Sequence, residues 1–391
     1  MHFIIETTLI ALATYLGLAS LYQLILALAS KAKTEARSVC PTKERKFLVL
    51  VPAYKEDAVI LKTTKHNLQM KYRYHKDLFD YVVISDSLQD ETNAELRKTG
   101  ARVIEVNLTK STKVKALQAA MAQCKDQYDG VVILDADNTV DSHFLNTANQ
   151  YMAQGFKAIQ GQRIAANEEN TAALLDGLSE KANNAMLCAG ANRLGFSSKL
   201  SGSGMVFNYQ LFKEMVYQLN AIGGFDKELE IALTKQRTFI KYAERLVVKD
   251  QKVSSFKAMS KQRGRWIQAQ YSFMAKAFFP ALKALFSGNK DHFHKVMQLA
   301  LPPRALAPFA LLSLVLLGAI ASGSLFIIST VALIILMSGY ALLLRGPAMT
   351  QQFWPLLKAM PRLFMATLGS FKWAQRSRTE FIHTSHKMIE A

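Results

Sequence analysis

Apolar residues dominate the N-terminal part of the chain. Between Phe3 and Ser30 the only charged side chain is Glu6. A helix rises about 1.5 Å per residue and a bilayer core is about 30 Å thick, so this run is long enough to cross a membrane. A cleaved signal peptide is the alternative, but the run is longer than a signal core and lacks a basic start. We expect residues 1–30 to form a retained membrane helix.

A second apolar region precedes the C-terminal part. No charged residue occurs between Arg304 and Arg345, and Ser322-Gly323-Ser324 lies near the middle of this region. A single helix of this length would overshoot the bilayer, which favours two helices joined by a turn. A buried hairpin in a soluble core is the alternative. We predict two membrane helices within residues 305–344.

Lysine and arginine flank these apolar regions. Cations follow the first region directly, and others follow the last region as far as Lys387. Basic flanks stay in the cytoplasm. Three crossings then place residues 31–265 at the cytoplasmic face of the inner membrane. The C-terminal segment, residues 345–391, returns to the same side as an interfacial segment and tail.

Short apolar runs alternate with helix-like stretches in the middle of the chain. The runs have strand length and are apolar on both faces: 47–52, 81–85, 101–106 and 131–134. The stretches between them are 58–70, 92–99 and 112–125. Strands buried on both faces and separated by helices are typical of a doubly wound α/β domain. We predict such a domain, with its ligand site beyond the carboxyl ends of the strands.

Composition and charge narrow the class of function. Half of the 391 residues are hydrophobic, which excludes a disordered chain, and the net charge is +18. Three cysteines without metal-ligand spacing argue against a disulfide scaffold or a zinc site. The cations gather beside the apolar regions and no nucleic-acid motif occurs, so we expect no nucleic-acid partner. A glycine-rich phosphate loop is absent too, which disfavours dinucleotide chemistry.

Acidic residues follow two of the predicted strands. Asp86 ends the second strand, and Asp135-Ala136-Asp137 follows the fourth. Two carboxylates at positions i and i+2 are suited to hold Mg²⁺ or Mn²⁺ between the protein and a substrate diphosphate. A helix cap or a solvated loop is the alternative for an acidic turn of this kind. The motifs in the rest of the chain favour the metal.

Seven motifs occur in an order that resembles family 2 glycosyltransferases. Between Phe47 and Trp266 they are VPAYKE, SDSLQDET, KVKALQAA, LDADN, SGSGMVF, FDKELEIAL and QRGRW. The resemblance is closest to the membrane-bound group that includes cellulose, chitin and hyaluronan synthases. It implies a GT-A fold and an inverting, metal-dependent hexosyltransferase that uses a UDP-sugar. The acceptor it implies is a polysaccharide or a lipid-linked glycan.

The resemblance also assigns residues to the metal and the donor. Asp137 would ligate Mg²⁺ or Mn²⁺. The donor-binding positions would be Pro52, Tyr54, Glu56, Asp86, Lys113, Lys115, Asp135, Gln262, Arg263 and Arg265. The arginines suit a diphosphate because a planar guanidinium donates to two oxygens at once.

The acceptor side and the general base follow from the same resemblance. Gly202-Ser203-Gly204 would line the acceptor, and the Trp266 ring would stack on a sugar, with an interfacial anchor as its alternative role. The base departs from the family pattern. Alignment on the following Leu-Glu-Ile places Glu228 where relatives have aspartate, and Asp226 is the second candidate.

Residues 266–304 are expected to form amphipathic helices at the membrane interface, kinked at Pro280, with a core helix as the alternative. Two other functions stay open. One is a polyprenyl-phosphate sugar synthase, which has no need of a stacking Trp266, and the other is a catalytically silent scaffold that binds nucleotide sugars. Three membrane helices are few to enclose a sugar channel. We therefore expect a homo-oligomer, export partner subunits or a lipid-linked acceptor.

Overall fold

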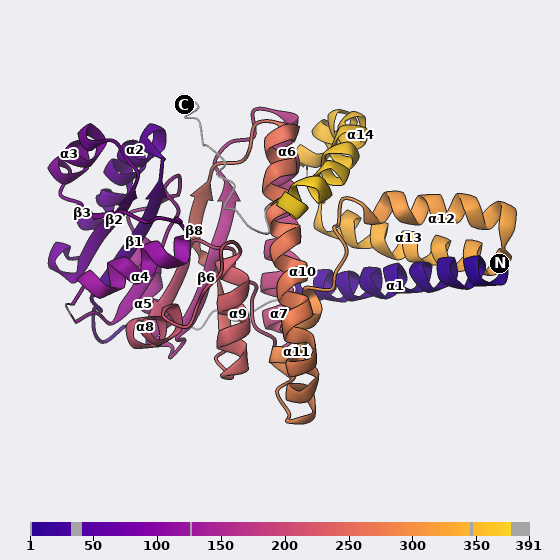
Figure 1. Cartoon of the computed structure of the whole chain (residues 1–391), viewed down its shortest axis with the longest axis horizontal. Coiled ribbons are helices and arrows are strands. Elements are labelled where there is room, and N and C mark those ends of the chain that lie inside the picture. The colour runs from indigo at the N-terminus through magenta and orange to yellow at the C-terminus, as the bar shows by residue number, and fades with distance from the viewer. Residues whose placement is uncertain (1, 33–40, 126, 345–346, 377–391) are drawn as a thin grey trace.

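A computed structural model describes residues 2–32, 41–125, 127–344 and 347–376 (Figure 1). The predicted tail beyond residue 376 lies outside the described residues. The strands are β1 (Phe47–Tyr54), β2 (Phe79–Asp86), β3 (Arg102–Val106), β4 (Gly130–Ile133), β5 (Thr139–Val140), β6 (Ala158–Ala165), β7 (Met205–Asn208) and β8 (Ile240–Asp250). The helices of the sheet domain are α2 (Asp57–Asn67), α3 (Asp90–Lys98), α4 (Lys113–Gln123), α5 (Phe144–Ala153), α6 (Thr171–Asn183), α7 (Ala191–Arg193), α8 (Tyr209–Val216) and α9 (Phe225–Lys235).

The other helices flank the sheet domain or connect its elements. Five long or apolar helices are α1 (His2–Ala29), α10 (Phe256–Phe286), α12 (Ala307–Ala321), α13 (Gly323–Leu343) and α14 (Pro347–Arg376), and α11 (Lys290–Gln298) is a shorter one. Two 3₁₀ turns, η1 (Leu68–Tyr72) and η2 (Lys76–Leu78), precede β2. A π-helical turn, η3 (Asn184–Gly190), continues α6.

All eight strands belong to one mixed sheet, in the order β3-β2-β1-β4-β7-β6-β8-β5. The first four strands are parallel, which confirms the prediction for this half. Strand β7 runs antiparallel to both of its neighbours, and β5 runs antiparallel to β8. The second half of the sheet, for which the apolar runs predicted no strands, therefore has mixed strand directions.

Alternation along the strands divides the core into two layers, one on each face of the sheet. In β1, Phe47, Val49 and Val51 belong to one cluster of buried side chains, while Leu48 and Leu50 belong to the other. Successive side chains of a strand point to opposite faces, so a strand buried in both layers must be apolar throughout. This explains why the continuous apolar runs predicted the parallel strands correctly.

The apolar helices α1, α12 and α13 lie side by side and project away from the sheet (Figure 1). By length and composition α1 and α13 are suited to cross a membrane, whereas α12 is shorter, with 15 residues. The predicted turn is confirmed: Ser322 caps α13, and its hydroxyl donates to Glu6 Oε1 at 2.6 Å. That all three helices cross a membrane stays a prediction.

Helix α10 runs without interruption across residue 265, where sequence analysis placed a domain boundary. It packs along α14, and the two backbones approach closely at Gly264, where a Cβ would lie 2.5 Å from Trp373 Cβ. In Figure 1 both helices stand between the sheet and the apolar helices. The QRGRW motif therefore lies on a long helix that joins the two parts of the molecule.

Candidate active site

Three carboxylates from distant parts of the chain meet at the carboxyl ends of strands in the sheet. Asp135 and Asp137 lie in the turn after β4, and Asp250 is the last residue of β8. Pairing of β5 with β8, with Thr139 opposite Lys249, carries the turn to the end of β8. One oxygen from each carboxylate lies within 4.8 Å of the others, and Asp137 and Asp250 are buried. Negative charges this close repel each other unless a cation neutralises them.

The amide of Asn138 connects the three acids. Its Nδ2 donates to Asp137 Oδ1 at 3.3 Å and to Asp250 Oδ1 at 3.1 Å, and its Oδ1 accepts from the Asp135 amide at 3.0 Å. Asn138 is fully buried, and the amide of Gln251 adds a 3.2 Å bond to Asp137 Oδ2. These bonds fix the orientation of the Asp137 and Asp250 carboxylates before any ligand arrives.

Asp250 also anchors a buried network of charges that sequence analysis missed. Its Oδ2 lies 2.6 Å from Arg163 Nη2 and 2.7 Å from Lys252 Nζ, and Lys252 lies 3.3 Å from Glu180. Burial opposes ionisation of Asp250, but the two cations outweigh it and hold the pKa of Asp250 well below its ordinary value. The sequence alone does not mark Asp250, because β8 (IKYAERLVVKD) carries charged residues along its length and only its pairing with β5 brings Asp250 to the cluster.

Lys113 reaches the carboxylates from the first turn of α4, which Thr112 caps. Its ammonium forms an ion pair with Asp135 and donates to the Gly202 carbonyl at 2.9 Å. Lys115 lies two positions farther along the helix, and its side chain is exposed. Of the two lysines predicted to approach the donor, only Lys113 lies among the site residues.

The segment before β7 is held by cations. Three consecutive carbonyls accept from three different elements: Leu200 from Lys227, Ser201 from Arg163, and Gly202 from Lys113. Gly204 has a φ of 63°, and a Cβ there would lie 2.8 Å from Val248 Cγ2, so only glycine fits. The Ser203 hydroxyl is buried and has no protein partner within the described part of the chain. The predicted acceptor loop is thus a fixed wall of the site.

The two candidate bases face different sides of α9. Asp226 accepts from Lys227 at 2.9 Å, whereas Glu228 accepts from the amides of Asn220 and Ala221 at 3.0 and 2.8 Å. Burial opposes ionisation of Asp226, but Lys227 and two further lysines of the site hold its pKa below its ordinary value. Positions two apart on a helix differ by about 200°, so only one of these acids faces the site lysines, and it is Asp226.

The two arginines of the QRGRW motif also diverge. Arg265 lies within electrostatic range of Asp135; burial lowers the pKa of its guanidinium, and the carboxylate partly offsets this. Arg263 instead donates to Thr367 on α14 at 3.3 Å. Gln262 Oε1 is buried without a protein partner among the described residues, and Trp266 is 48% exposed. The motif therefore has one arginine on the side of the carboxylates and one on the side of α14.

The VPAYKE segment borders Asp86. Tyr54 is paired with Asp86 in the register of β1 and β2, and the Lys55 amide donates to the Asp86 carbonyl at 3.1 Å. The Asp86 carboxylate is buried and accepts from the Ser111 hydroxyl. Pro52 precedes Tyr54 in the strand, and Glu56 is buried at the start of α2. These predicted donor residues therefore form one continuous rim at the ends of β1 and β2.

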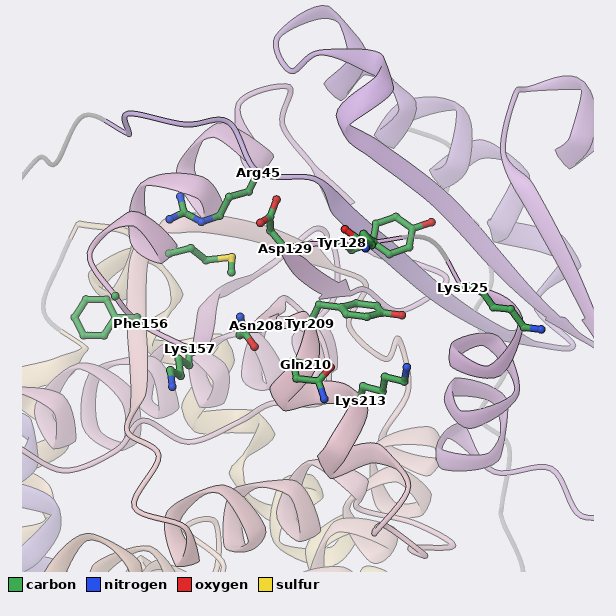
Figure 2. A pocket seen from close by; sticks show the side chains of 13 residues that line it. Arg45, Lys125, Tyr128, Asp129, Phe156, Lys157, Asn208, Tyr209, Gln210 and Lys213 are labelled. Carbon is green, nitrogen blue, oxygen red and sulfur yellow. The ribbon is translucent and has the colours of Figure 1, made fainter.

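A cavity of about 580 Å³ lies at the opposite end of the central strands, where β4 begins and β7 ends (Figure 2). Its lining includes Arg45, Lys125, Tyr128, Lys157 and Lys213. None of the three clustered carboxylates lines it. We therefore place the candidate active site at the carboxylates and not in this cavity.

Comparison with known proteins agrees with this arrangement. A family model described as glycosyltransferase like family 2 matches residues 44–269. The mannosyltransferase PcManGT from Pyrobaculum calidifontis, solved in complex with GDP-Man and Mn²⁺, matches with a TM-score of 0.55 and 17% identity over 92% of this chain and 99% of that chain. Glucosyl-3-phosphoglycerate synthase from Mycobacterium tuberculosis matches with a TM-score of 0.42 and 18% identity, over 59% of this chain and 80% of that chain. A search of curated proteins finds no match. The fold is of the GT-A type predicted from the sequence.

Proposed function

The chain belongs to the glycosyltransferase-like family 2, and on that premise we propose that it transfers a hexose, with inversion, from a UDP-sugar to an acceptor at the cytoplasmic face of a membrane. The observation that carries the proposal is the convergence of Asp135, Asp137 and Asp250 at the strand ends. This is the edge where α/β sheets bind ligands. The acceptor would be a growing polysaccharide or a lipid-linked glycan.

The three carboxylates fit Mg²⁺ or Mn²⁺, because both ions prefer oxygen ligands and the buried amide of Asn138 already orients Asp137 and Asp250. Asp135 and Asp137 would hold the ion, with Asp250 beside them. When bound, the ion would offset negative charge on the departing diphosphate.

Cations of the site would complete the donor contacts. Lys113 is paired with Asp135, and Arg265 lies within electrostatic range of the same acid, so both would bring positive charge to the diphosphate. Asp86 and the rim at Tyr54 would contact the nucleoside. A GDP-sugar is the second donor to test, because the mannosyltransferase of similar fold was solved with GDP-Man.

We assign the proton acceptor to Asp226 in preference to Glu228. Asp226 lies among the site lysines with a lowered pKa, which keeps the carboxylate ionised, and Lys227 positions it. Glu228 is occupied by two loop amides on the other side of α9. Trp266, half exposed beside Arg265, would stack on the acceptor ring.

The membrane would supply or receive the acceptor. Helices α1 and α13 are suited to cross it, and residues 31–265 would lie on its cytoplasmic side. Because so few helices cannot enclose a wide channel, we propose either a lipid-linked acceptor or assembly with further copies or export subunits.

Purified protein in nanodiscs, incubated with a panel of UDP- and GDP-sugars and membrane extract, tests the proposal. We expect metal-dependent release of one nucleotide, abolished by EDTA and restored by Mn²⁺. Asp86→Ala should weaken binding of that nucleotide, whereas Asp77→Ala, at an exposed acid outside the site, should not. Nucleotide-sugar binding with no release for any donor would contradict an enzyme and favour a silent scaffold.

A further inference from the structure

The proposed base is held by its own neighbour in the sequence. Lys227 Nζ lies 2.9 Å from Asp226 Oδ2, although the two residues are adjacent on α9. Adjacent positions of a helix differ by about 100°, so their side chains do not ordinarily face each other. A lysine side chain is also long and flexible, and it loses conformational freedom when it is fixed. A second group is therefore needed to keep Lys227 turned toward Asp226.

Glu230 is that second group. It follows Lys227 by three positions, which places the two side chains on one side of the helix, and Glu230 Oε2 lies 3.7 Å from Lys227 Nζ. Glu230 is buried, with only 2% of the residue exposed. Burial opposes the charge on Lys227, but the Asp226 and Glu230 carboxylates outweigh it and raise the pKa of the ammonium. The ammonium is thus shared between the proposed base and a buried acid.

The same two residues also bind the segment that leads into the predicted acceptor loop, Gly202-Ser203-Gly204. The Leu200 amide donates to Glu230 Oε1 at 2.6 Å, and the Leu200 carbonyl accepts from Lys227 Nζ at 3.4 Å. Both polar backbone groups of Leu200 are therefore bound to α9, just before the loop begins. Glu230 and Lys227 together fix the proposed base relative to this loop.

Glu230 also contacts a second cation. Lys295 of α11 is 1% exposed, and its Nζ lies 3.8 Å from Glu230 Oε1 and donates to Gln298 Oε1 at 3.0 Å. Gln298 in turn donates to the hydroxyl of Tyr22 on α1, at 3.0 Å. A buried ammonium is costly without a counter-charge, so Glu230 also has a structural role. Variants must therefore separate its contact with Lys227 from its contact with Lys295.

We propose that Glu230 is a positioning residue for the transfer reaction: through Lys227 it holds the Asp226 carboxylate in a fixed place relative to the acceptor loop. The proposal rests on the function proposed above, in which Asp226 takes the proton of the acceptor hydroxyl. A base works only within hydrogen-bond reach of that hydroxyl, so a carboxylate that can turn away loses rate without weakening donor binding. Glu230 itself takes no proton in this step.

Glu230→Gln isolates the charge, because the glutamine oxygen still accepts from the Leu200 amide. Release of nucleotide is measured in nanodiscs at saturating donor, with membrane extract as the source of acceptor. We expect the rate to fall about tenfold, the size of one hydrogen bond to a charged group, with UDP affinity unchanged. The matched control, Lys295→Met, removes the second cation and should keep the rate within about threefold. An unchanged rate in Glu230→Gln, or an equal loss in Lys295→Met, would overturn the positioning role.

A double variant shows whether Glu230 acts through the base. In the Asp226→Asn background, Glu230→Gln should lower the residual rate by less than about twofold, because the carboxylate that it places is already gone. A purely structural defect would cost the same factor in both backgrounds, and that result would overturn the proposal. Full transfer by Asp226→Asn alone would refute the base assignment, and the positioning role with it. Absence of transfer in the unmodified protein would instead refute the proposed function.

Discussion

The two ends of the central sheet both gather cations, but in different ways. At the carboxyl ends of β4 and β8, Lys113 and Arg163 each contact a carboxylate and a backbone carbonyl. At the opposite end, the cavity in Figure 2 is lined by the exposed side chains of Lys125, Lys157 and Lys213. Exposed charges interact weakly because water screens them, whereas buried charges must be paired. Positive charge alone therefore does not mark a site, and buried acids placed among the cations do.

The largest effect on transfer is expected from variants that distinguish the two ends of the sheet. Asp137→Asn should reduce transfer by about 10³-fold or more, because the carboxylate cluster loses a ligand for the ion. The double variant Lys157→Met/Lys213→Met, at the opposite end, should keep transfer within a factor of about two. Nucleotide release is measured in both. Loss of activity in the double variant would show that the far cavity takes part in the reaction.

A second contrast lies within α9. Asp226→Asn should reduce transfer by about 10²- to 10⁴-fold, the usual contribution of a positioned base. Glu228→Gln should cost less than about fivefold, because the glutamine oxygen still accepts from the two loop amides. Rates are compared at saturating donor, with UDP affinity as the control. The opposite ranking would restore the register that aligns Glu228 with the family aspartate.

The two arginines of α10 give a third contrast. Arg265→Lys should reduce kcat/KM by about 10- to 100-fold, since lysine cannot donate to two diphosphate oxygens in the same plane. Arg263→Lys should leave kcat/KM nearly unchanged and act only on stability, because Arg263 contacts Thr367 on α14. Equal kinetic losses in both variants would mean that both arginines reach the donor.

The smallest effect concerns folding. Asp250→Asn leaves Arg163 without its contacting carboxylate and Lys252 with Glu180 alone, which should cost about 3 kcal/mol. The melting temperature in detergent should fall by roughly 6–12 °C. Glu105→Gln removes the exposed ion pair with Arg97 and should cost less than about 1 kcal/mol. Equal melting temperatures for the two variants would contradict a structural role for the buried network.

The local sequence pattern was sufficient to predict one half of the sheet and the acids at the ends of its strands. Asp86, Asp135 and Asp137 follow apolar runs that are buried on both faces, so the strands and the acids at their ends were predictable together. Strand β7 has only three apolar residues in its run, Met205 to Phe207, and its antiparallel pairing depends on contacts far along the chain. Asp250 needed the same long-range knowledge, because only the pairing of β5 with β8 brings it to Asp137.

The direction in which each helical side chain points was the other feature that could not be predicted from the sequence. Alignment placed Glu228 at the position of the family aspartate, and motif spacing treated Arg263 and Arg265 as equivalent. On a helix, residues two positions apart point to nearly opposite sides. An alignment register or a shared motif therefore says little about what each side chain contacts. The contacts of α9 and α10 with their neighbours distinguish these residues.

The central claim is that Asp135 and Asp137, with Asp250 beside them, hold a divalent ion that binds the nucleotide diphosphate. Titration of Mn²⁺ into the protein, followed by electron paramagnetic resonance with and without UDP, tests it most directly. The account predicts one bound Mn²⁺ whose affinity rises with UDP, and loss of that site in Asp137→Asn but not in Asp141→Asn, an exposed acid just after the cluster. Equal stoichiometry and affinity in Asp137→Asn and the unmodified protein would contradict it.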